Sequence, residues 1–237
     1  ISKNGDNKGT VNKIYVPDYA CWDSLGPVLV EHGLEWQKYD LGIDFSPNFS
    51  KLHGDIDIIL FINFFGICNF KSIASQLRKR FPNIVIILDN VQALHDLKNN
   101  GENGSWADWQ YFSFRKFLPL PGGAMALNIN KQFDTSKVVE TKYDEDWKNA
   151  AIMRYKFLHS SNVNDYEKKY LPLFKKAKNN LICNSIDISK LSYLLQNYYD
   201  LTKFASKRRN NYRYLAEGLN KFRWINACIP ELNAEQV

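Results

Sequence analysis

Two short apolar runs constrain the fold of this chain more than any other feature of its sequence. Residues 55–66 read "DIDIILFINFFG" and residues 83–90 read "NIVIILDN". A strand with one wet face alternates apolar and polar residues, whereas a strand of a parallel sheet is covered on both faces and is apolar at consecutive positions. We therefore predict that both runs are fully buried strands of a parallel sheet.

The segments around these runs alternate between strand and helix patterns. Apolar residues recur at helical spacing in 21–36, with a stop at Gly33, and in 69–83, where the helix ends before Pro82. Further strands are predicted in 12–20, 109–114 and 122–130, and a short helix or turn in 91–101. This alternation predicts an α/β fold with a mostly parallel central sheet, right-handed crossovers and flanking helices.

The pattern changes near Asp144. Long helices are predicted from there on, over Trp147 to Leu158, Asp165 to Ala177 and Ile188 to Phe222. The change places a boundary near 131–145 and divides the chain into an α/β core, 1–140, and a helical region, 141–237. The core has 14 Lys and Arg against 15 Asp and Glu, and the helical region has 17 against 10, so the net charge of +6 arises wholly in the helical region. Such a surplus suits phosphate-bearing ligands or nucleic acid, but its spacing also fits the wet faces of helices.

Composition excludes several classes of protein. With 237 residues and 45% hydrophobic side chains, the chain can form a substantial core. The longest apolar run, Ile56 to Cys68, is interrupted by polar residues and falls short of the roughly 20 residues that a membrane span needs. The first ten residues are polar and do not resemble a signal peptide. The four cysteines and four histidines are widely separated, so we expect no metal site and reduced thiols in a cytoplasmic protein.

Polar side chains follow the predicted strands at the points where they end. Asn63 ends the first run, Asp89 and Asn90 end the second, and Ser113 with Lys116 follow the strand that begins at Trp109. Ligands of open α/β sheets bind outside the carboxyl ends of the strands. An amide, an acid, a hydroxyl and an amine are thus expected to converge on one ligand.

Each of these residues also has a purely structural interpretation. Asp89 or Asn90 can cap the helix-like segment that follows. Asn63 can satisfy backbone groups at a strand end, and Ser113 can face a neighbouring strand. Lys116 can be a solvated loop charge. Spacing alone leaves these alternatives open.

Five short sequence segments, taken in order, resemble those of a known protein family. "VPDYAC", "INFFG", "VIILDNVQAL", "ADWQYFSFRKFLPLPGG" and "RRNNYRYL" are similar, in sequence and spacing, to the DegT/DnrJ/EryC1/StrS family of sugar aminotransferases, which depend on pyridoxal 5'-phosphate (PLP). The resemblance covers roughly residues 12 to 225. It implies the large domain of the fold type I PLP-dependent transferases, followed by a segment that leads to a small C-terminal domain. It also implies a protein longer at both ends, with the phosphate-anchoring segment before Ile1.

The resemblance implies a role for each residue of the site. Lys116 matches the lysine that binds the cofactor covalently and moves a proton, and Asp89 matches the acid that pairs with the pyridine nitrogen. Gln92 matches a residue near the ring hydroxyl, with Asn63 close by, and Ser113 matches a contact to the cofactor phosphate. An ionised carboxylate suits the pairing, because it keeps the ring nitrogen protonated.

Two positions near the site depart from the family pattern or have no assigned role. The residue that stacks on the cofactor ring is either Cys21 or Trp22, because relatives commonly have an aromatic residue where this chain has Cys21. Arg115 has no assigned role. Together with the aromatic residues around Lys116, Arg115 favours the neutral, nucleophilic form of the lysine amine.

The resemblance implies transfer of an amino group from glutamate or glutamine to a nucleotide-linked keto-sugar, in the biosynthesis of a cell-surface polysaccharide or a secondary metabolite. It also implies a homodimer in which each site is completed by the partner chain. Two alternatives remain. One is dehydration or related chemistry at a sugar carbon with the same cofactor, and the other is a degenerate homologue that binds a partner, a nucleic acid or an anionic surface through its basic helical region.

Overall fold

A computed structural model describes residues 12–52, 54–94, 104–120, 122–128, 143–159, 163–179, 188, 190–219 and 221–222. The strands are β1 (Lys13–Pro17), β2 (Glu35–Leu41), β3 (Pro47–Asn48), β4 (Ile58–Ile62), β5 (Val85–Asp89), β6 (Trp109–Ser113) and β7 (Ala124–Asn128). The helices are α1 (Trp22–Glu31), α2 (Lys71–Arg80), α3 (Tyr143–His159), α4 (Val163–Asn179), α5 (Lys190–Tyr198) and α6 (Leu201–Leu219). Two 3₁₀ turns, η1 (Phe64–Gly66) and η4 (Phe114–Lys116), follow β4 and β6.

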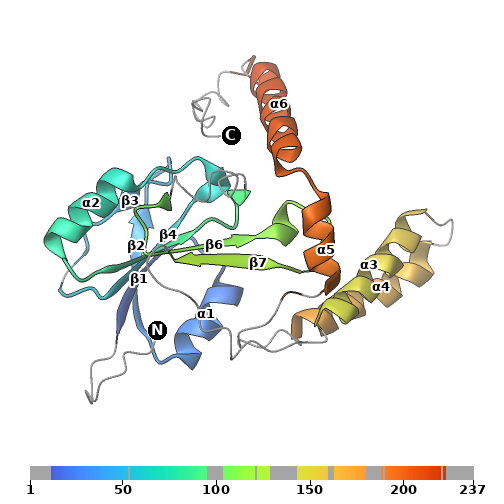
Figure 1. Ribbon diagram of the computed structural model, residues 1–237, viewed down its shortest axis with the longest axis horizontal. Helices are drawn as coiled ribbons and strands as arrows, with labels where there is room; N and C mark the ends of the chain where they lie inside the picture. Colours follow the sequence, from blue (N-terminus) through green and yellow to red (C-terminus); the bar gives the residue numbers. More distant parts are fainter. Residues whose placement is uncertain are drawn as a thin grey trace.

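The described strands form one sheet in the order β3-β2-β1-β4-β5-β6-β7 (Figure 1). Neighbours from β2 to β6 are parallel, whereas β3 and β7 pair antiparallel at the two edges. The prediction of an α/β fold with a mostly parallel sheet is confirmed. The chain passes from β1 outward to β2 and then returns to the other side of β1 to form β4. The strand order therefore reverses between β1 and β4, which is where open α/β sheets bind ligands.

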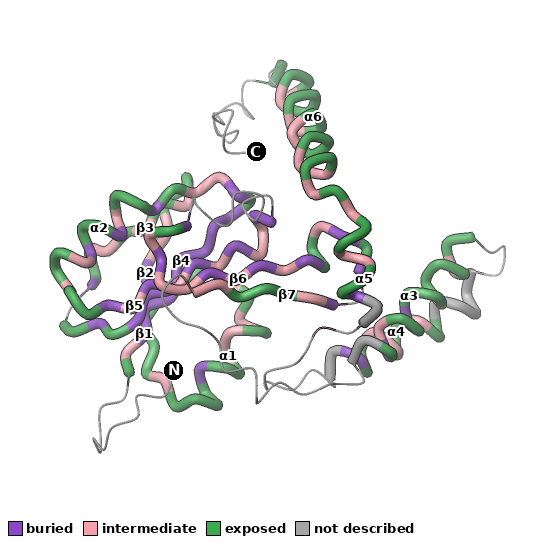
Figure 2. Tube along the Cα trace, viewed as in Figure 1, coloured by how far each residue is buried: buried purple, intermediate pink, exposed green. Residues whose placement is uncertain are grey.

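The helices α1 and α2 cover opposite faces of the sheet (Figure 1). On one face, Leu29 of α1 packs against a buried cluster that includes Val16 of β1 and Leu60 of β4. On the other, Leu77 of α2 packs against a cluster that includes Phe61 of β4. The sheet is accordingly the most buried part of the chain in Figure 2.

The two apolar runs differ in their burial. All five residues of β4 are buried, which confirms that this strand is covered on both faces. In β5 only Ile86 and Leu88 are buried, whereas Val85, Ile87 and Asp89 are half-buried. The prediction of full burial was therefore wrong for β5. The half-buried side chains lie on the face that α1 covers. In the described part of the chain, the buried cluster on that face is formed mainly by residues of α1, β1 and β4, and Val85 and Ile87 pack only against its margin.

The sequence did not reveal β2 and β3, because the predicted helix was extended to Trp36. Only Tyr39 is buried in β2, and the residues from Glu35 to Lys38 are exposed. The hydroxyl of Tyr39 donates a hydrogen bond to the carbonyl of Leu60 at 2.7 Å. A strand near the edge of a sheet has little apolar surface to bury, so it lacks the pattern that identified β4.

The helical region has four helices in its described part. The predicted helices at Trp147 to Leu158 and Asp165 to Ala177 correspond to α3 and α4 with wider bounds. The single helix predicted over Ile188 to Phe222 is instead two helices, α5 and α6. Asp200 separates them, because its carboxylate accepts hydrogen bonds from the backbone N–H groups of Thr202 at 2.8 Å and Lys203 at 3.3 Å. These bonds make Asp200 the cap of α6.

Part of the sequence interpretation lies outside the described residues. This holds for the first ten residues, for most of the predicted boundary at 131–145 and for the end of the segment 91–101. The division of the chain into 1–140 and 141–237 therefore stays a prediction. Among the helices that the structure describes, none is long and apolar enough to cross a membrane.

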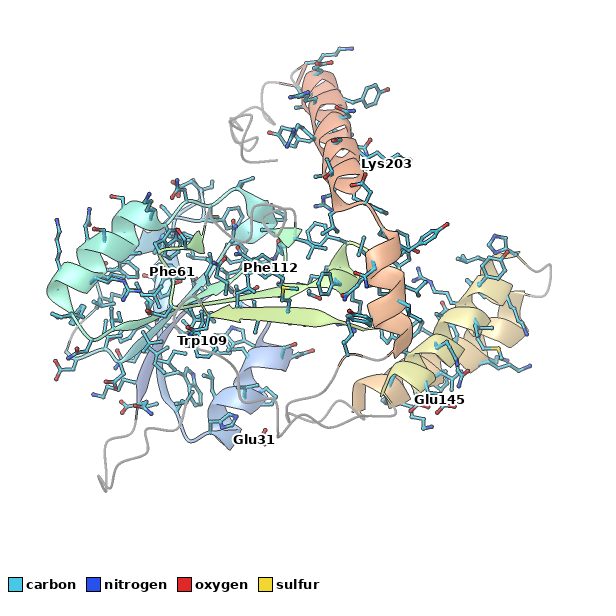
Figure 3. All side chains as sticks on the ribbon, viewed as in Figure 1. Glu31, Phe61, Trp109, Phe112, Glu145 and Lys203 are labelled. Carbon is cyan, nitrogen blue, oxygen red and sulfur yellow. The ribbon has the colours of Figure 1, made fainter. Side chains whose placement is uncertain are left out.

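Replacing Phe61 tests which contacts hold the sheet together. Its side chain is fully buried, stacks on Phe70 at 4.8 Å and meets the edge of Trp106 at 5.9 Å; Figure 3 labels it within the sheet. We expect Phe61→Ala to lower the free energy of unfolding by about 3–5 kcal/mol, because it removes buried area and leaves a cavity. Urea denaturation measures this change. Phe65→Ala is the control, since Phe65 is 58% exposed, and we expect it to lower stability by less than about 1 kcal/mol.

Candidate active site at the carboxyl ends of the strands

The carboxyl ends of β4, β5 and β6 lie side by side at one edge of the sheet. In the strand register, Asp89 at the end of β5 pairs with Ile62 of β4 on one side and with Tyr111 of β6 on the other. Asn63 follows Ile62 directly, and its backbone N–H donates to the carbonyl of Asp89 at 2.9 Å. The structure therefore brings Asn63 and Asp89 together beside the point where the strand order reverses.

Asp89 lies in a half-buried position and has three polar neighbours. One carboxylate oxygen, Oδ1, accepts a hydrogen bond from the backbone N–H of Val91 at 2.8 Å. Hydrogen bonding from the phenol of Tyr111 and the positive charge of Lys116 both lower the pKa of the same carboxylate. Burial is the largest influence and raises the pKa of Asp89, while these three neighbours lower it. Asp89 is thus both a local turn cap and a half-buried acid whose pKa is lowered by the charge of an amine.

Lys116 is exposed at the end of η4. The desolvated amine that its aromatic neighbours predicted is therefore not what the structure contains. The adjacent Arg115 lies over the ring of Trp147 in α3, with 4.9 Å between the guanidinium carbon and the ring centroid. This contact gives Arg115 a position that the sequence did not predict.

Ser113 ends β6 and precedes η4. It lies two residues after Tyr111, so both side chains project from the same face of the sheet. Tyr111 packs against the apolar cluster on the α1 face, and Ser113 makes no side-chain hydrogen bond to cap η4. The Ser113 hydroxyl is therefore on the same face as Asp89 and Tyr111.

Three buried amides connect the strand ends beneath this face. Asn63 donates from Nδ2 to Oδ1 of Asn90, and Asn90 donates from Nδ2 to Oε1 of Gln110, each at 2.9 Å. The Oδ1 atom of Asn63 also accepts from the backbone N–H of Cys68 at 3.0 Å. These bonds fix the ends of β4, β5 and β6 relative to one another, since buried polar networks are rigid when their groups are paired. Asn63 therefore satisfies a backbone group at a strand end, which is the structural alternative given for it above. Its contact with a cofactor stays a prediction.

Gln92 joins the loops that follow β4 and β5. Its Oε1 atom accepts a hydrogen bond from the backbone N–H of Phe65 at 3.0 Å. Phe65 has φ of 56°, a left-handed conformation that is uncommon for a residue with a side chain. Gln92 thus stabilises a strained turn next to Asn63. Its predicted place near the cofactor hydroxyl is not tested by these contacts.

The two candidates for ring stacking lie at the start of α1. Trp22 has the ammonium nitrogen of Lys38 at 4.2 Å from its ring centroid, and its Nε1 donates to the carbonyl of Asp18 at 3.2 Å. Cys21 is exposed, with its sulfur 3.5 Å from the hydroxyl of Ser24. Cys21 therefore contacts the first turn of α1, while Trp22 interacts with β2. Which of them stacks on a ring stays a prediction.

Sequence reasoning missed Tyr111 and Gln110. The signal was the period of two in "WQYFSF", because alternate residues of a strand share a face. Tyr111 is on the face of Ser113, and Gln110 is on the buried opposite face. A polar residue buried within a strand needs a partner, which predicts a second polar group on the neighbouring strand.

The site combines an acid and hydroxyl groups on one face of the sheet with an amine on the turn that follows β6. A partly buried carboxylate gains free energy when a cationic nitrogen approaches it, because the positive charge offsets desolvation. A primary amine can attack a carbonyl carbon. Among the residues that the structure describes, no group of three or more His, Cys, Asp or Glu side chains is arranged to hold a metal ion. The arrangement suits an organic ligand that has both a cationic nitrogen and a carbonyl group.

No protein-family model and no curated protein sequence matches this chain. Solved structures do match parts of it. NtdA from Bacillus subtilis with bound cofactor PMP is 16% identical, with 52% of this chain and 28% of that chain covered and a TM-score of 0.41. The 3-amino-5-hydroxybenzoic acid (AHBA) synthase is 12% identical, with 62% and 37% covered and a TM-score of 0.39. The phosphoserine aminotransferase SerC from Cytophaga hutchinsonii is 14% identical, with 71% and 48% covered and a TM-score of 0.36.

The chain spans less than half the length of each of these three structures. It covers 28% of NtdA, 37% of the AHBA synthase and 48% of SerC. Each therefore contains substantial segments that have no counterpart in the matched part of this chain.

Asp89→Asn tests whether burial of the Asp89 charge opposes folding. Because the pKa of Asp89 is raised above its ordinary value of 3.8, the folded protein holds a proton that the unfolded chain releases. The free energy of unfolding of the unmodified protein therefore falls as pH rises from the ordinary pKa of Asp89 through its raised pKa in the folded protein. The neutral asparagine avoids this loss. We expect Asp89→Asn to be at least as stable at pH 7, with no advantage near pH 3. Urea midpoints across this range measure the difference.

Asp44→Asn is the matched control with the opposite sign. Hydrogen bonds from Ser46 lower the pKa of Asp44, so its charge contributes stability above the ordinary pKa that is lost as pH falls. We expect Asp44→Asn to reduce stability slightly at pH 7, since Asp44 is exposed. A loss of stability in Asp89→Asn that grows with pH would contradict the interpretation of Asp89.

Proposed function

We propose that this chain forms the cofactor-binding core of a PLP-dependent enzyme of fold type I. The observation that carries the proposal is the half-buried carboxylate of Asp89 at the end of β5, next to β6 and the turn η4 that carries Lys116, whose charge lowers the pKa of Asp89 against the raising effect of burial. PLP has the two groups that this site suits, a ring nitrogen that can be protonated and an aldehyde. When bound, PLP supplies an electron sink for the carbon next to the amino nitrogen of the substrate.

Asp89 would hold the ring nitrogen. Its carboxylate is partly withdrawn from water, so an opposite charge at this position is favourable and keeps the carboxylate ionised. The hydrogen bond from Val91 fixes one oxygen of the carboxylate. The amide network of Asn63, Asn90 and Gln110 holds β5 in register below it.

Lys116 would bind the cofactor aldehyde and move protons at the reacting carbon. Its exposed amine at the end of η4 is free of the steric confinement of the sheet, and the contact of Arg115 with Trp147 fixes the adjacent residue. Ser113, three residues earlier and on the face of Asp89, would contact the phosphate. Hydroxyl and backbone N–H groups are the usual ligands of such dianions.

The remaining site residues would shape the pocket. Gln92 and Asn63 border it through the turn at Phe65, which Gln92 stabilises. Either Cys21 or Trp22 at the start of α1 would lie against the ring. In this proposal 1–140 binds the cofactor, and 141–237 leads to a small C-terminal domain.

Within this cofactor class we propose an aminotransferase of the cytoplasm. Glutamate or glutamine would donate the amino group, and a nucleotide-linked keto-sugar would receive it, in polysaccharide or secondary-metabolite biosynthesis. The support is the resemblance of "LDNVQA" and "FSFRK" to the sugar aminotransferases. The same resemblance supports a homodimer in which the partner chain completes each site.

Lys116→Ala tests the cofactor assignment. We expect the unmodified protein with PLP to give a near-visible absorption band, and borohydride reduction followed by peptide mapping to find the mass of the cofactor on Lys116. In Lys116→Ala the band and the labelled peptide should be absent, because η4 (Phe114–Lys116) then has no lysine. Lys79→Ala is the control, since Lys79 is exposed on α2 at the opposite face.

Two outcomes would contradict the cofactor assignment. One is an unmodified protein that shows no band at saturating PLP. The other is label on many lysines with no enrichment at Lys116. Strong, salt-sensitive nucleic-acid binding in place of the band would favour the degenerate homologue instead.

Isotope transfer tests the reaction class. We expect 15N from labelled glutamate or glutamine to enter a keto-sugar nucleotide in the presence of the protein and PLP, with loss of transfer in Lys116→Ala. A sugar product that loses water and gains no 15N would favour dehydration. Mass spectrometry of the sugar separates the two reactions, and the unlabelled acceptor without amino donor is the control.

A further inference from the structure

Tyr111 is the side chain most closely coupled to Asp89. The two residues are register partners on adjacent parallel strands, so their side chains project from the same face of the sheet, and hydrogen bonding from the phenol lowers the pKa of the carboxylate. Nothing in the resemblance assigns Tyr111 a role. Its position is nevertheless within the site, because it lies between Asp89 on β5 and Ser113 on its own strand.

The backbone around Tyr111 is held on both sides. Its carbonyl accepts a hydrogen bond from the N–H of Asn90 at 2.9 Å, and on the other side Tyr111 pairs with Ala126 of β7. A side chain on a strand paired on both sides is located more precisely than one on a loop. Tyr111 therefore offers Asp89 a donor in a fixed place.

The other two groups that act on Asp89 cannot replace this donor. Val91 contributes a backbone N–H to Oδ1. Lys116 is exposed on η4, and the proposed function requires its amine to react and to move protons. Only Tyr111 combines a fixed position with a side chain that takes no part in the proposed reaction.

The phenol also keeps its proton. Burial raises the pKa of Tyr111 well above its ordinary value of 10.0, and the charge of Asp89 raises it further. Tyr111 therefore stays a donor at neutral pH. In the described part of the chain, Tyr111 and Lys116 are the titratable groups that act on Asp89.

We propose that Tyr111 is a positioning residue that orients the carboxylate of Asp89 and keeps it ionised, so that Asp89 can hold a cationic ring nitrogen. The use of the site for PLP rests on the proposed function, but the coupling of Tyr111 and Asp89 exists in the chain without any ligand. The two can therefore be tested separately.

The first experiment uses the protein without cofactor. The pKa of Asp89 is measured by NMR of 13C-labelled aspartate carboxyl groups, with the signal assigned by its loss in Asp89→Asn. We expect Tyr111→Phe to raise the pKa of Asp89, because the charged form loses a hydrogen bond. Tyr39→Phe is the control: it removes another buried phenol, which donates to Leu60, and should leave the pKa of Asp89 unchanged.

The second experiment measures PLP binding across pH. We expect Tyr111→Phe to bind PLP roughly tenfold more weakly at neutral pH, since a hydrogen bond to a charged group contributes about that factor. Affinity should recover at higher pH, where Asp89 is ionised without help. A merely structural role would weaken binding equally at every pH.

The outcomes separate the two proposals. An unchanged pKa of Asp89 in a folded Tyr111→Phe protein would overturn the role of Tyr111. Absence of PLP binding by the unmodified protein would overturn the proposed function, and the NMR result would still decide the coupling. If Tyr111→Phe does not fold, biosynthetic incorporation of 3-fluorotyrosine gives a more acidic donor, which should instead lower the pKa of Asp89.

Discussion

The in-register parallel pairing of β4, β5 and β6 is the constraint on which the rest of the structure depends. Buried apolar side chains on both faces of β4 hold this strand in the sheet, and a slip of one residue would reverse the faces of every side chain. Because the three strands are parallel, the polar residues that follow them meet at one edge. The amides of Asn63, Asn90 and Gln110 then fix that edge by hydrogen bonds.

Asp89 at this edge lowers the stability of the fold but provides a charged group that can bind a ligand. A carboxylate at a half-buried strand end opposes folding through desolvation, which its raised pKa records. The hydrogen bonds of Val91 and Tyr111 and the charge of Lys116 reduce this opposition without removing it. The part of the desolvation cost that remains favours the binding of a positive group, because a positive charge on the ligand offsets the cost of burying the Asp89 carboxylate.

The helical region contributes to the position of Lys116. Arg115 lies over Trp147 of α3, and Arg208 of α6 lies over Phe117 at 4.6 Å. Phe114 packs with residues of α5 and α6 in a further apolar cluster. The turn that carries Lys116 is thus contacted by side chains of α3, α5 and α6, which lie far from it in the sequence.

The sequence by itself determined the α/β class, the strands β1, β4, β5, β6 and β7 and the strand-end residues, because burial on both faces and the period of the helices are local patterns. It missed β2, whose exposed residues lack such a pattern, and the break at Asp200 within an otherwise helical run. Only the tertiary structure decided that Lys116 is exposed, that Asn63 binds Asn90 and that Tyr111 stands beside Asp89. Those facts depend on strand register and on which elements cover each face, and both are set by contacts between residues far apart in the chain.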